Sequence, residues 1–216
     1  MTTANDKAKI NNVLISCHDK IGLKYFAAEL AKINPNIRIY CSSGTFNELK
    51  KAVASANLIE ISDYTGVKEM PAGLVKTLHP KIHSGILADL NDKEQLKYLE
   101  DNKAVAFDLV VVNLYPFASA ADSGGIEKAR TNIDIGGVSL IEAAAKNFLR
   151  VAAVVSPVDY EKLLEILRKN AGSCDIQTRV ELAKTAMDYL SAYIGNISSY
   201  YENLTTGAVK KEYKVE

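Results

Sequence analysis

The chain has 216 residues, and its 26 lysines and arginines balance its 26 aspartates and glutamates, so the formal net charge is zero. Apolar residues make up 48% of the chain and charged residues 24%, which is the composition of a compact globular protein and excludes a disordered or fibrous one. This length allows one domain with an appendage, and the absence of a basic excess argues against partners such as nucleic acid or an anionic membrane.

The cysteines and the amino terminus indicate the compartment. Cys17, Cys41 and Cys174 are odd in number and form no CxxC pair, which argues against a disulfide framework and against a zinc site. The first residues are polar, and the longest apolar runs, such as 109–112, are far shorter than the roughly 18 residues of a membrane span. We therefore expect a cytoplasmic protein.

The first half of the chain alternates between strand and helix patterns. After a polar lead-in over 1–11, the apolar run 13–15 predicts a strand, and apolar residues at three- and four-residue spacing predict a helix over 23–33. A second strand is predicted over 37–41, a helix from about 45 to 55, and a third strand over 58–61. The polar loops that follow the first two strands lie at 16–22 and 41–45.

The second half continues the alternation. The Val-rich run 107–114 is typical of a strand buried on both faces, and 151–155 predicts another strand. Helices are predicted over 124–130, 138–148 and 157–170. Alternation with short connections predicts an α/β domain over 10–170, with three layers and a mostly parallel sheet.

A carboxyl-terminal extension follows this domain, after the break at Gly172 and Ser173. Apolar residues from 176 to 197 trace the stripe of an amphipathic helix, so residues 171–204 are predicted to form a helical extension. The stripe must be covered within the chain or by a second subunit, and we expect a homodimer. The polar residues 205–216 are predicted to form a flexible tail.

Ligands of open α/β sheets bind beyond the carboxyl ends of the strands, so the loops there are the places to search. Residues 16–22 and 41–45 offer hydroxyls, a lysine and helix-start amides, which suit an anion such as phosphate. Ordinary helix capping by the same residues is the alternative. Neither loop matches a Walker or GxGxxG motif, which argues against a nucleoside triphosphatase or a nicotinamide enzyme.

The segment 70–85 is too irregular for plain scaffold, because it contains two prolines, two glycines, two histidines and two lysines. Partial burial would make Lys76 useful as an acid or as an oxyanion partner, and a solvated surface charge is the alternative. His79 and His83 are better explained as structural residues than as metal ligands, since no HExxH motif or further ligand accompanies them.

The fourth candidate region combines 113–117 with 132–137 and the helix that carries Lys146. Asp134 precedes two glycines and is either a helix cap or a site carboxylate. Lys146 follows three alanines on a helix, so it either points into a site or interacts with the helix dipole.

Six motifs, in the same order and at near-identical spacing, closely resemble the IMP cyclohydrolase domain of the bifunctional AICAR transformylase/IMP cyclohydrolase family. They are Ser16-x-x-Asp19-Lys20-x-Gly22, SDYTG at 62–66, VKTLHPKIH at 75–83, NLYPF at 113–117, NIDIGG at 132–137 and AAAKN at 143–147. The resemblance runs from about residue 12 to 170. Residues 176–200 resemble the first helix of the family's transformylase domain, so we do not expect transformylase activity.

This resemblance implies a methylglyoxal-synthase-like fold and a reaction, the dehydrative closure of 5-formamidoimidazole-4-carboxamide ribotide (FAICAR) to IMP. By the family's pattern, Lys76 and Tyr115 orient and protonate the formyl group, while Asp134, paired with Lys146, deprotonates the carboxamide. No metal and no other cofactor is implied, and a separate formylating enzyme would supply the ribotide. The implied substrate-binding residues are Ser16, Lys20, Ser42, Gly44, Thr45, Thr77, Asn113, Ile135, Gly136 and Gly137.

The sequence departs from the family's pattern at positions expected to contact phosphate. Leu74 stands where the family has an arginine, His18 where it has a serine, and Ser43 where it has a glycine. Loss of the arginine weakens the expected hold on the phosphate, and a protonated His18 would compensate. Glu142 and Phe148 also replace family residues, an arginine and a histidine, on the helix with Lys146.

Two other functions stay open at this stage. His18-Asp19 faintly resembles methylglyoxal synthase, a lyase on the same scaffold, although that family's Gly-Pro-x-Gly-Gly-Asp segment is missing. A non-catalytic regulatory domain that binds a purine ribotide is the other alternative. It is disfavoured because a sensor has no need of all four predicted catalytic side chains.

Overall fold

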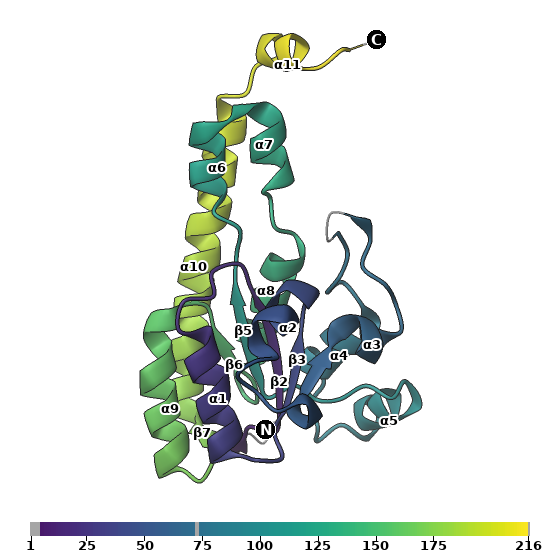
Figure 1. Ribbon diagram of the computed structural model, residues 1–216, viewed down its shortest axis with the longest axis vertical. Helices are drawn as coiled ribbons and strands as arrows, with labels where there is room; N and C mark the ends of the chain where they lie inside the picture. The colour runs from purple at the N-terminus through teal and green to yellow at the C-terminus, as the bar shows by residue number, and fades with distance from the viewer. Residues whose placement is uncertain (1–4, 72–73, 216) are drawn as a thin grey trace.

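The computed structural model of the chain describes residues 5–71 and 74–215, so Ala72 and Gly73 of the irregular segment lie outside the described residues. Its centre is a five-stranded sheet in the order β4-β3-β2-β5-β6, with all neighbours parallel (Figure 1). The strands are β2 (Asn12–Cys17), β3 (Arg38–Cys41), β4 (Leu58–Glu60), β5 (Leu109–Asn113) and β6 (Ala152–Val154). Parallel strands that are neighbours in the sheet place their carboxyl ends along one edge.

Helices cover both faces of this sheet and confirm the prediction of a three-layer α/β fold. One face packs against α1 (Leu23–Ile33), α2 (Ser43–Leu49) and α9 (Tyr160–Lys169). The other packs against α4 (Pro80–Leu87), α8 (Gly136–Lys146) and α10 (Ile176–Glu202). The second helix, predicted from about 45 to 55, ends at Leu49. Short 3₁₀ turns lie over Ser55–Asn57 and Pro157–Asp159.

Alternation along the strands divides the core in two. In β2, Val13 and Ile15 join the cluster under α1 and α9, whereas Leu14 joins the cluster under α4, α8 and α10. The same division holds in β5, where Val111 and Val112 face opposite sides. All of these side chains are at most 1% exposed, as expected of a parallel sheet covered on both faces.

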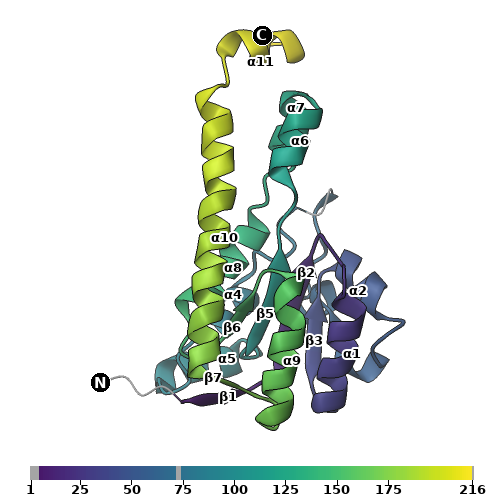
Figure 2. The same cartoon turned by 90° about the vertical axis from the view of Figure 1, so that its left-hand side faces the viewer.

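Helix α10 is the longest element and extends well beyond the sheet (Figure 2). Its carboxyl-terminal half runs beside α6 (Phe117–Ser123) and α7 (Gly125–Thr131) in Figure 1. Two further helices, α3 (Ile61–Thr65) and α5 (Lys93–Asp101), lie on the other side of the molecule. Despite the length of α10, no helix within residues 5–71 and 74–215 is long and apolar enough to cross a membrane.

The carboxyl-terminal residues differ from the predicted flexible tail, because Thr206–Glu212 form helix α11. The carboxylate of Glu212 accepts hydrogen bonds from the backbone N–H groups of Ile126 at 2.7 Å and Glu127 at 2.8 Å, at the start of α7. The sequence pattern did not indicate this contact, since it depends on a partner about 85 residues away.

A second, two-stranded sheet lies where the sequence indicates a break. Strand β1 (Lys7–Lys9) pairs antiparallel with β7 (Ser173–Asp175), immediately before α10. Beside it, the fully buried guanidinium of Arg179 donates to five backbone carbonyls. These acceptors are Asn5, Asp6, Phe148, Leu149 and Cys174. The extension over 171–204 is thus joined to the amino terminus and forms part of one helical layer.

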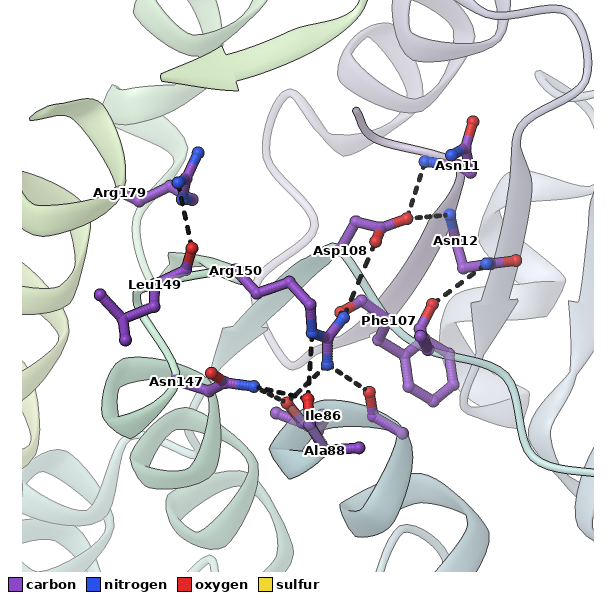
Figure 3. Close-up of polar contacts among 12 residues, drawn as sticks. Asn11, Asn12, Ile86, Ala88, Phe107, Asp108, Asn147, Leu149, Arg150 and Arg179 are labelled. Carbon is purple, nitrogen blue, oxygen red and sulfur yellow. Dashed lines mark hydrogen bonds and ion pairs between the residues drawn. The ribbon is translucent and has the colours of Figure 1, made fainter. Parts of the chain in front are cut away.

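A polar network holds the amino-terminal edge of the sheet (Figure 3). The carboxylate of Asp108 accepts from the backbone N–H groups of Asn11 and Asn12, both at 2.9 Å. Arg150 lies 3.8 Å from Asp108 and donates to the carbonyls of Gly85 and Phe107, so it ties α4 to the sheet. These groups are structural and lie at the edge opposite to the loops that follow the strands.

Candidate active site

The loops after β2 and β3 bring three hydroxyl groups together at the carboxyl edge of the sheet. Ser16 Oγ donates to Ser42 Oγ at 3.2 Å, and Ser42 Oγ donates to Thr45 Oγ1 at 3.3 Å. Thr45 Oγ1 also accepts from the backbone N–H of Cys17 at 3.3 Å. This hydroxyl cluster (Ser16, Ser42 and Thr45) therefore unites the two loops that the sequence assigns to a phosphate, with Ser42 and Thr45 at most 4% exposed.

Asn113, the last residue of β5, fixes the first of these loops. Its Oδ1 accepts from the backbone N–H of Asp19 at 2.8 Å, and its Nδ2 donates to the Asp19 carbonyl at 2.9 Å. Asp19 Oδ1 in turn accepts from the N–H of Ile21, an ordinary turn contact. Lys20 donates to the carbonyl of His18 at 3.2 Å, so its ammonium folds back over the loop. Asn113 thus fixes the shape of the loop, and its side-chain amide is used for hydrogen bonds within the protein.

A carboxylate that the sequence analysis did not identify, that of Glu69, contacts the start of α2. Glu69 Oε1 accepts from Ser43 Oγ at 2.8 Å and from the Ser43 backbone N–H at 3.4 Å. Gly44, the next residue, is exposed, and a Cβ added to it would meet nothing within 4 Å, so close contact does not require glycine there. An anion at this loop would meet the charge of Glu69.

Three of the four predicted catalytic residues gather in one place. The ammonium of Lys76 lies 5.9 Å from the centre of the Tyr115 ring, and the charge of Lys76 acts on the carboxylate of Asp134. Lys76 is half-buried and follows Val75, whose φ of 62° is strained for a β-branched residue. The side chain of His18 joins them, with its ring centre 5.0 Å from that of Tyr115. We call Lys76, Tyr115 and Asp134 the catalytic cluster.

Asp134 has an unusual electrostatic environment within this cluster. Burial raises the pKa of its carboxyl group above the ordinary value, and this effect exceeds the opposing ones. The opposing effects come from the Gly137 N–H, which donates to Oδ1 at 2.7 Å, from Lys76, from the Tyr115 backbone and from His18. A carboxylate that is costly to ionise and is surrounded by donors is suited to accept a proton.

The two glycines after Asp134 allow α8 to begin between the loops of Lys76 and Tyr115. A Cβ on Gly136 would lie 2.6 Å from Thr77 Oγ1, and one on Gly137 would lie 2.5 Å from Leu114 Cδ2. Thr77 is buried, whereas Ile135 is 62% exposed beside it. The close approach explains both glycines without any ligand, and it places the backbone of 135–137 in the candidate site.

The two histidines of the segment 70–85 make structural contacts. His79 precedes α4, and its Nδ1 accepts from the backbone N–H of Lys81 at 3.1 Å. Burial, assisted by Lys81, lowers the pKa of His79. His83 Nε2 lies 3.2 Å from Ser139 Oγ on α8. Across the described part of the chain, no group of three or more His, Cys, Asp or Glu residues is arranged to hold a metal ion.

Lys146 is not part of the cluster, and the predicted pair with Asp134 does not form within the chain. It is the last residue of α8, whereas Asp134 lies two residues before the first, and the length of α8 separates them by about 15 Å or more at 1.5 Å per residue. Lys146 is exposed and lines an apolar groove of about 810 Å³ with Met187 of α10. Glu142 and Phe148 line the same groove, so these two departures from the family's pattern lie away from the catalytic cluster.

Leu74, which replaces the family's arginine, is 54% exposed and offers no charged group that would substitute for a guanidinium. The cysteine of the loop after β2 is also unreactive, because burial raises the pKa of the Cys17 thiol to about 12. The basic side chains that the described loops after β2 and β3 offer to a phosphate are therefore the ammonium of Lys20 and the imidazole of His18.

Comparison with known families divides the chain into two parts. Residues 22–139 match the sequence model of the MGS-like domain. Residues 144–216, which include α10, match the model of the AICARFT/IMPCHase bienzyme. The boundary falls within α8, so one packed domain spans both matches.

Individual proteins give the same grouping. The chain is 39% identical over 208 residues to the bifunctional purine biosynthesis protein PurH of Neisseria gonorrhoeae (strain ATCC 700825 / FA 1090), covering 95% of this chain and 39% of that protein. It is 40% identical over 198 residues to PurH of Neisseria meningitidis serogroup A / serotype 4A, covering 91% of the chain and 37% of that protein. The chain therefore spans about two fifths of these relatives.

One solved structure shares the fold. The crystal structure of ForH superimposes with a TM-score of 0.74 at 26% sequence identity. The match covers 89% of this chain and 99% of ForH.

Proposed function

Because the chain belongs to the MGS-like domain family and is homologous to the amino-terminal, IMP cyclohydrolase part of PurH, we propose that it is an IMP cyclohydrolase. The observation that carries the proposal is the catalytic cluster. Lys76, Tyr115 and Asp134 come from three distant parts of the sequence, and they meet at the carboxyl edge of the sheet. A domain that only binds a ribotide has no need of a buried carboxylate beside an ammonium and a phenol.

The substrate is FAICAR, and its 5′-phosphate is assigned to the loops after β2 and β3. The hydroxyl cluster supplies donors, Lys20 supplies positive charge, the His18 imidazole supplies a further polar group, and Asn113 keeps the first loop in place. When the phosphate binds, the carboxylate of Glu69 must either move away from Ser43 or remain beside the phosphate. The backbone of 135–137, which the glycines keep close to Thr77, faces the base.

The reaction needs little chemistry beyond placement and proton transfer. The carboxamide nitrogen attacks the formyl carbon and loses one proton to Asp134, while Lys76 or Tyr115 donates a proton to the formyl oxygen. The hydroxyl then leaves as water with the proton held by Asp134, and the former formamide nitrogen returns a proton to Lys76 or Tyr115 as the ring double bond forms. Because both reacting groups are on one molecule, holding them face to face supplies much of the rate.

This assignment leaves Lys146 out of the reaction within one chain, since it is exposed at the far end of α8. No metal or organic cofactor takes part in the proposed steps. We further propose a cytoplasmic homodimer that receives FAICAR from a separate formylating enzyme. The compartment rests on the cysteine content and the dimer on the exposed residues of α10. The formylating partner follows from the proposed substrate, whose formyl group an earlier reaction must attach.

The test is turnover of FAICAR by the purified chain, followed by the absorbance of IMP. We expect IMP to form, and Lys76→Ala to lower kcat by about 10²-fold or more with a smaller change in affinity for IMP. Lys68→Ala is the matched control, because Lys68 is an exposed lysine shortly before the segment 70–85 that carries Lys76. Absence of IMP formation by the wild type would overturn the proposal. Binding of IMP without turnover would indicate a regulatory domain, and methylglyoxal from dihydroxyacetone phosphate would indicate a lyase.

A further inference from the structure

We infer that Tyr189 and Tyr193 of α10 are positioning residues, whose hydroxyl groups hold the two loops that carry Tyr115 and Asp134. The inference rests on the proposed function for its catalytic meaning. The contacts themselves join α10, which matches the bienzyme model, to residues that match the MGS-like domain model.

Each tyrosine accepts a hydrogen bond from the backbone next to one catalytic side chain. Tyr189 Oη accepts from the backbone N–H of Leu114 at 3.0 Å, one residue before Tyr115. Tyr193 Oη accepts from the backbone N–H of Asp134 itself at 2.8 Å. The two tyrosines are four residues apart and therefore lie on one face of the helix, about 6 Å apart along its axis.

Tyr193 also uses its hydroxyl proton. It donates to the carbonyl of Asn132 at 3.2 Å, so one phenol closes the turn from Asn132 to Asp134 through both a donor and an acceptor. Burial raises the pKa of both phenols, with a further contribution from the charge of Asp134, so both remain protonated at neutral pH. Tyr193 is 8% exposed, which keeps competing water away from the turn.

Regular secondary structure provides no hydrogen-bond acceptor for the backbone N–H of Leu114 or of Asp134. Leu114 lies just after the last residue of β5, and Asp134 lies before the first residue of α8, so neither N–H has a partner in regular structure. The two tyrosines replace those partners with atoms of a rigid 27-residue helix. Tyr115 and Asp134 are therefore set relative to each other through α10 as well as through their own contact.

Loss of a hydroxyl group should therefore alter turnover more than binding. Small displacements of reacting groups have large effects on rate, whereas the hydroxyl groups of the two tyrosines bond to the loops of Tyr115 and Asp134 and not to the hydroxyl cluster assigned to the phosphate. We expect Tyr189→Phe and Tyr193→Phe each to lower kcat by about tenfold or more, with KM changed by less than about threefold. The double variant should lose more than either single variant.

The experiment compares these variants with Tyr200→Phe on the same helix, whose hydroxyl makes no hydrogen bond among the described residues. Turnover of FAICAR is measured together with amide hydrogen exchange by NMR and with affinity for IMP. We expect the Leu114 amide to lose protection in Tyr189→Phe, and the Asp134 amide to lose protection in Tyr193→Phe. Tyr200→Phe should match the wild type in all three measurements.

The outcomes separate this inference from the proposed function. Wild-type kcat in both single variants, or an equal loss in Tyr200→Phe, would overturn the inference while the cyclohydrolase assignment stands. If the wild type does not convert FAICAR to IMP, the proposed function fails. The positioning role is then judged by amide exchange alone, and unchanged protection of Leu114 in Tyr189→Phe and of Asp134 in Tyr193→Phe would refute it.

Discussion

Glu69 Oε1 accepts a hydrogen bond from Ser43 Oγ at 2.8 Å, beside the hydroxyl cluster to which the substrate phosphate is assigned. An arriving phosphate must separate this pair or bind against its negative charge. The loop that carries Glu69 also leads to Lys76, so the contact links the phosphate loops to the catalytic cluster.

Glu69→Gln is therefore expected to tighten the binding of IMP and of inorganic phosphate. Removal of one negative charge near the phosphate should lower Kd by about three- to tenfold at low ionic strength, with less effect in high salt. Isothermal titration calorimetry measures both ligands. Glu100→Gln, which removes an exposed carboxylate far along α5, serves as the control. Equal or weaker affinity in Glu69→Gln would contradict the expectation.

Asp134→Asn should abolish activity and stabilise the protein at neutral pH. The pKa of Asp134 is higher in the folded state than in the unfolded state, so the ionised wild type loses stability as pH rises from about 4 through the folded pKa. Asparagine can still accept from the Gly137 N–H but cannot ionise or take up the substrate proton. We expect kcat to fall by about 10² to 10⁴-fold.

The pH dependence of Tm tests whether Asp134→Asn stabilises the protein in the expected pH range. The gain of Asp134→Asn over the wild type should be largest near pH 7 and should vanish below about pH 4, where both side chains are neutral. A gain that grows on acidification would show that the carboxylate is not destabilised by burial.

Arg179→Lys should destabilise the whole domain. The guanidinium donates to five backbone carbonyls, and a lysine ammonium has only three donors. We expect the free energy of unfolding in urea to fall by about 2 to 4 kcal/mol. Arg38→Lys on the exposed start of β3 should change it by less than about 0.5 kcal/mol. Equal effects in the two variants would contradict the role of Arg179.

Met187→Asp combined with Ile194→Asp should produce a monomer. These residues are 50% and 48% exposed and lie seven apart with exposed Tyr201, which is the spacing of a helix-pairing seam. Around the adjacent groove, Glu142 and Asp188 are matched by Lys146 and Lys184, so a second copy meets no net charge. Light scattering should give a dimer for the wild type and for Asn196→Asp. A monomeric wild type would rule out this interface.

The sequence predicted the layered fold because its elements are local and strongly patterned. The run 109–113 is apolar throughout and became a strand buried on both faces, and α1 follows its three- and four-residue spacing. Strands β1 and β7 have no such pattern, because three residues held by a partner about 166 positions away leave little trace in composition. Helix α11 depends in the same way on the distant start of α7.

The site was only partly predictable for a related reason. Polar loops after strands identified Ser16, Ser42 and Thr45, and the family resemblance identified Lys76, Tyr115 and Asp134. The predicted helix over 138–148 already separates Lys146 from Asp134, as α8 does in the structure, but the family resemblance paired the two residues without regard to this separation. Glu69 and the two tyrosines gave no signal, because each acts on a partner at least 26 residues away.

Helix α10 connects two distant parts of the molecule, since Arg179 binds the carbonyls of Asn5 and Asp6 while Tyr193 binds the amide of Asp134. An expression tag or deletion at the amino terminus therefore alters the contacts of helix α10, and the middle of this helix supports the loop of Asp134. Preparations that differ only in their first nine residues should be assayed as different catalysts until their turnover has been shown to agree.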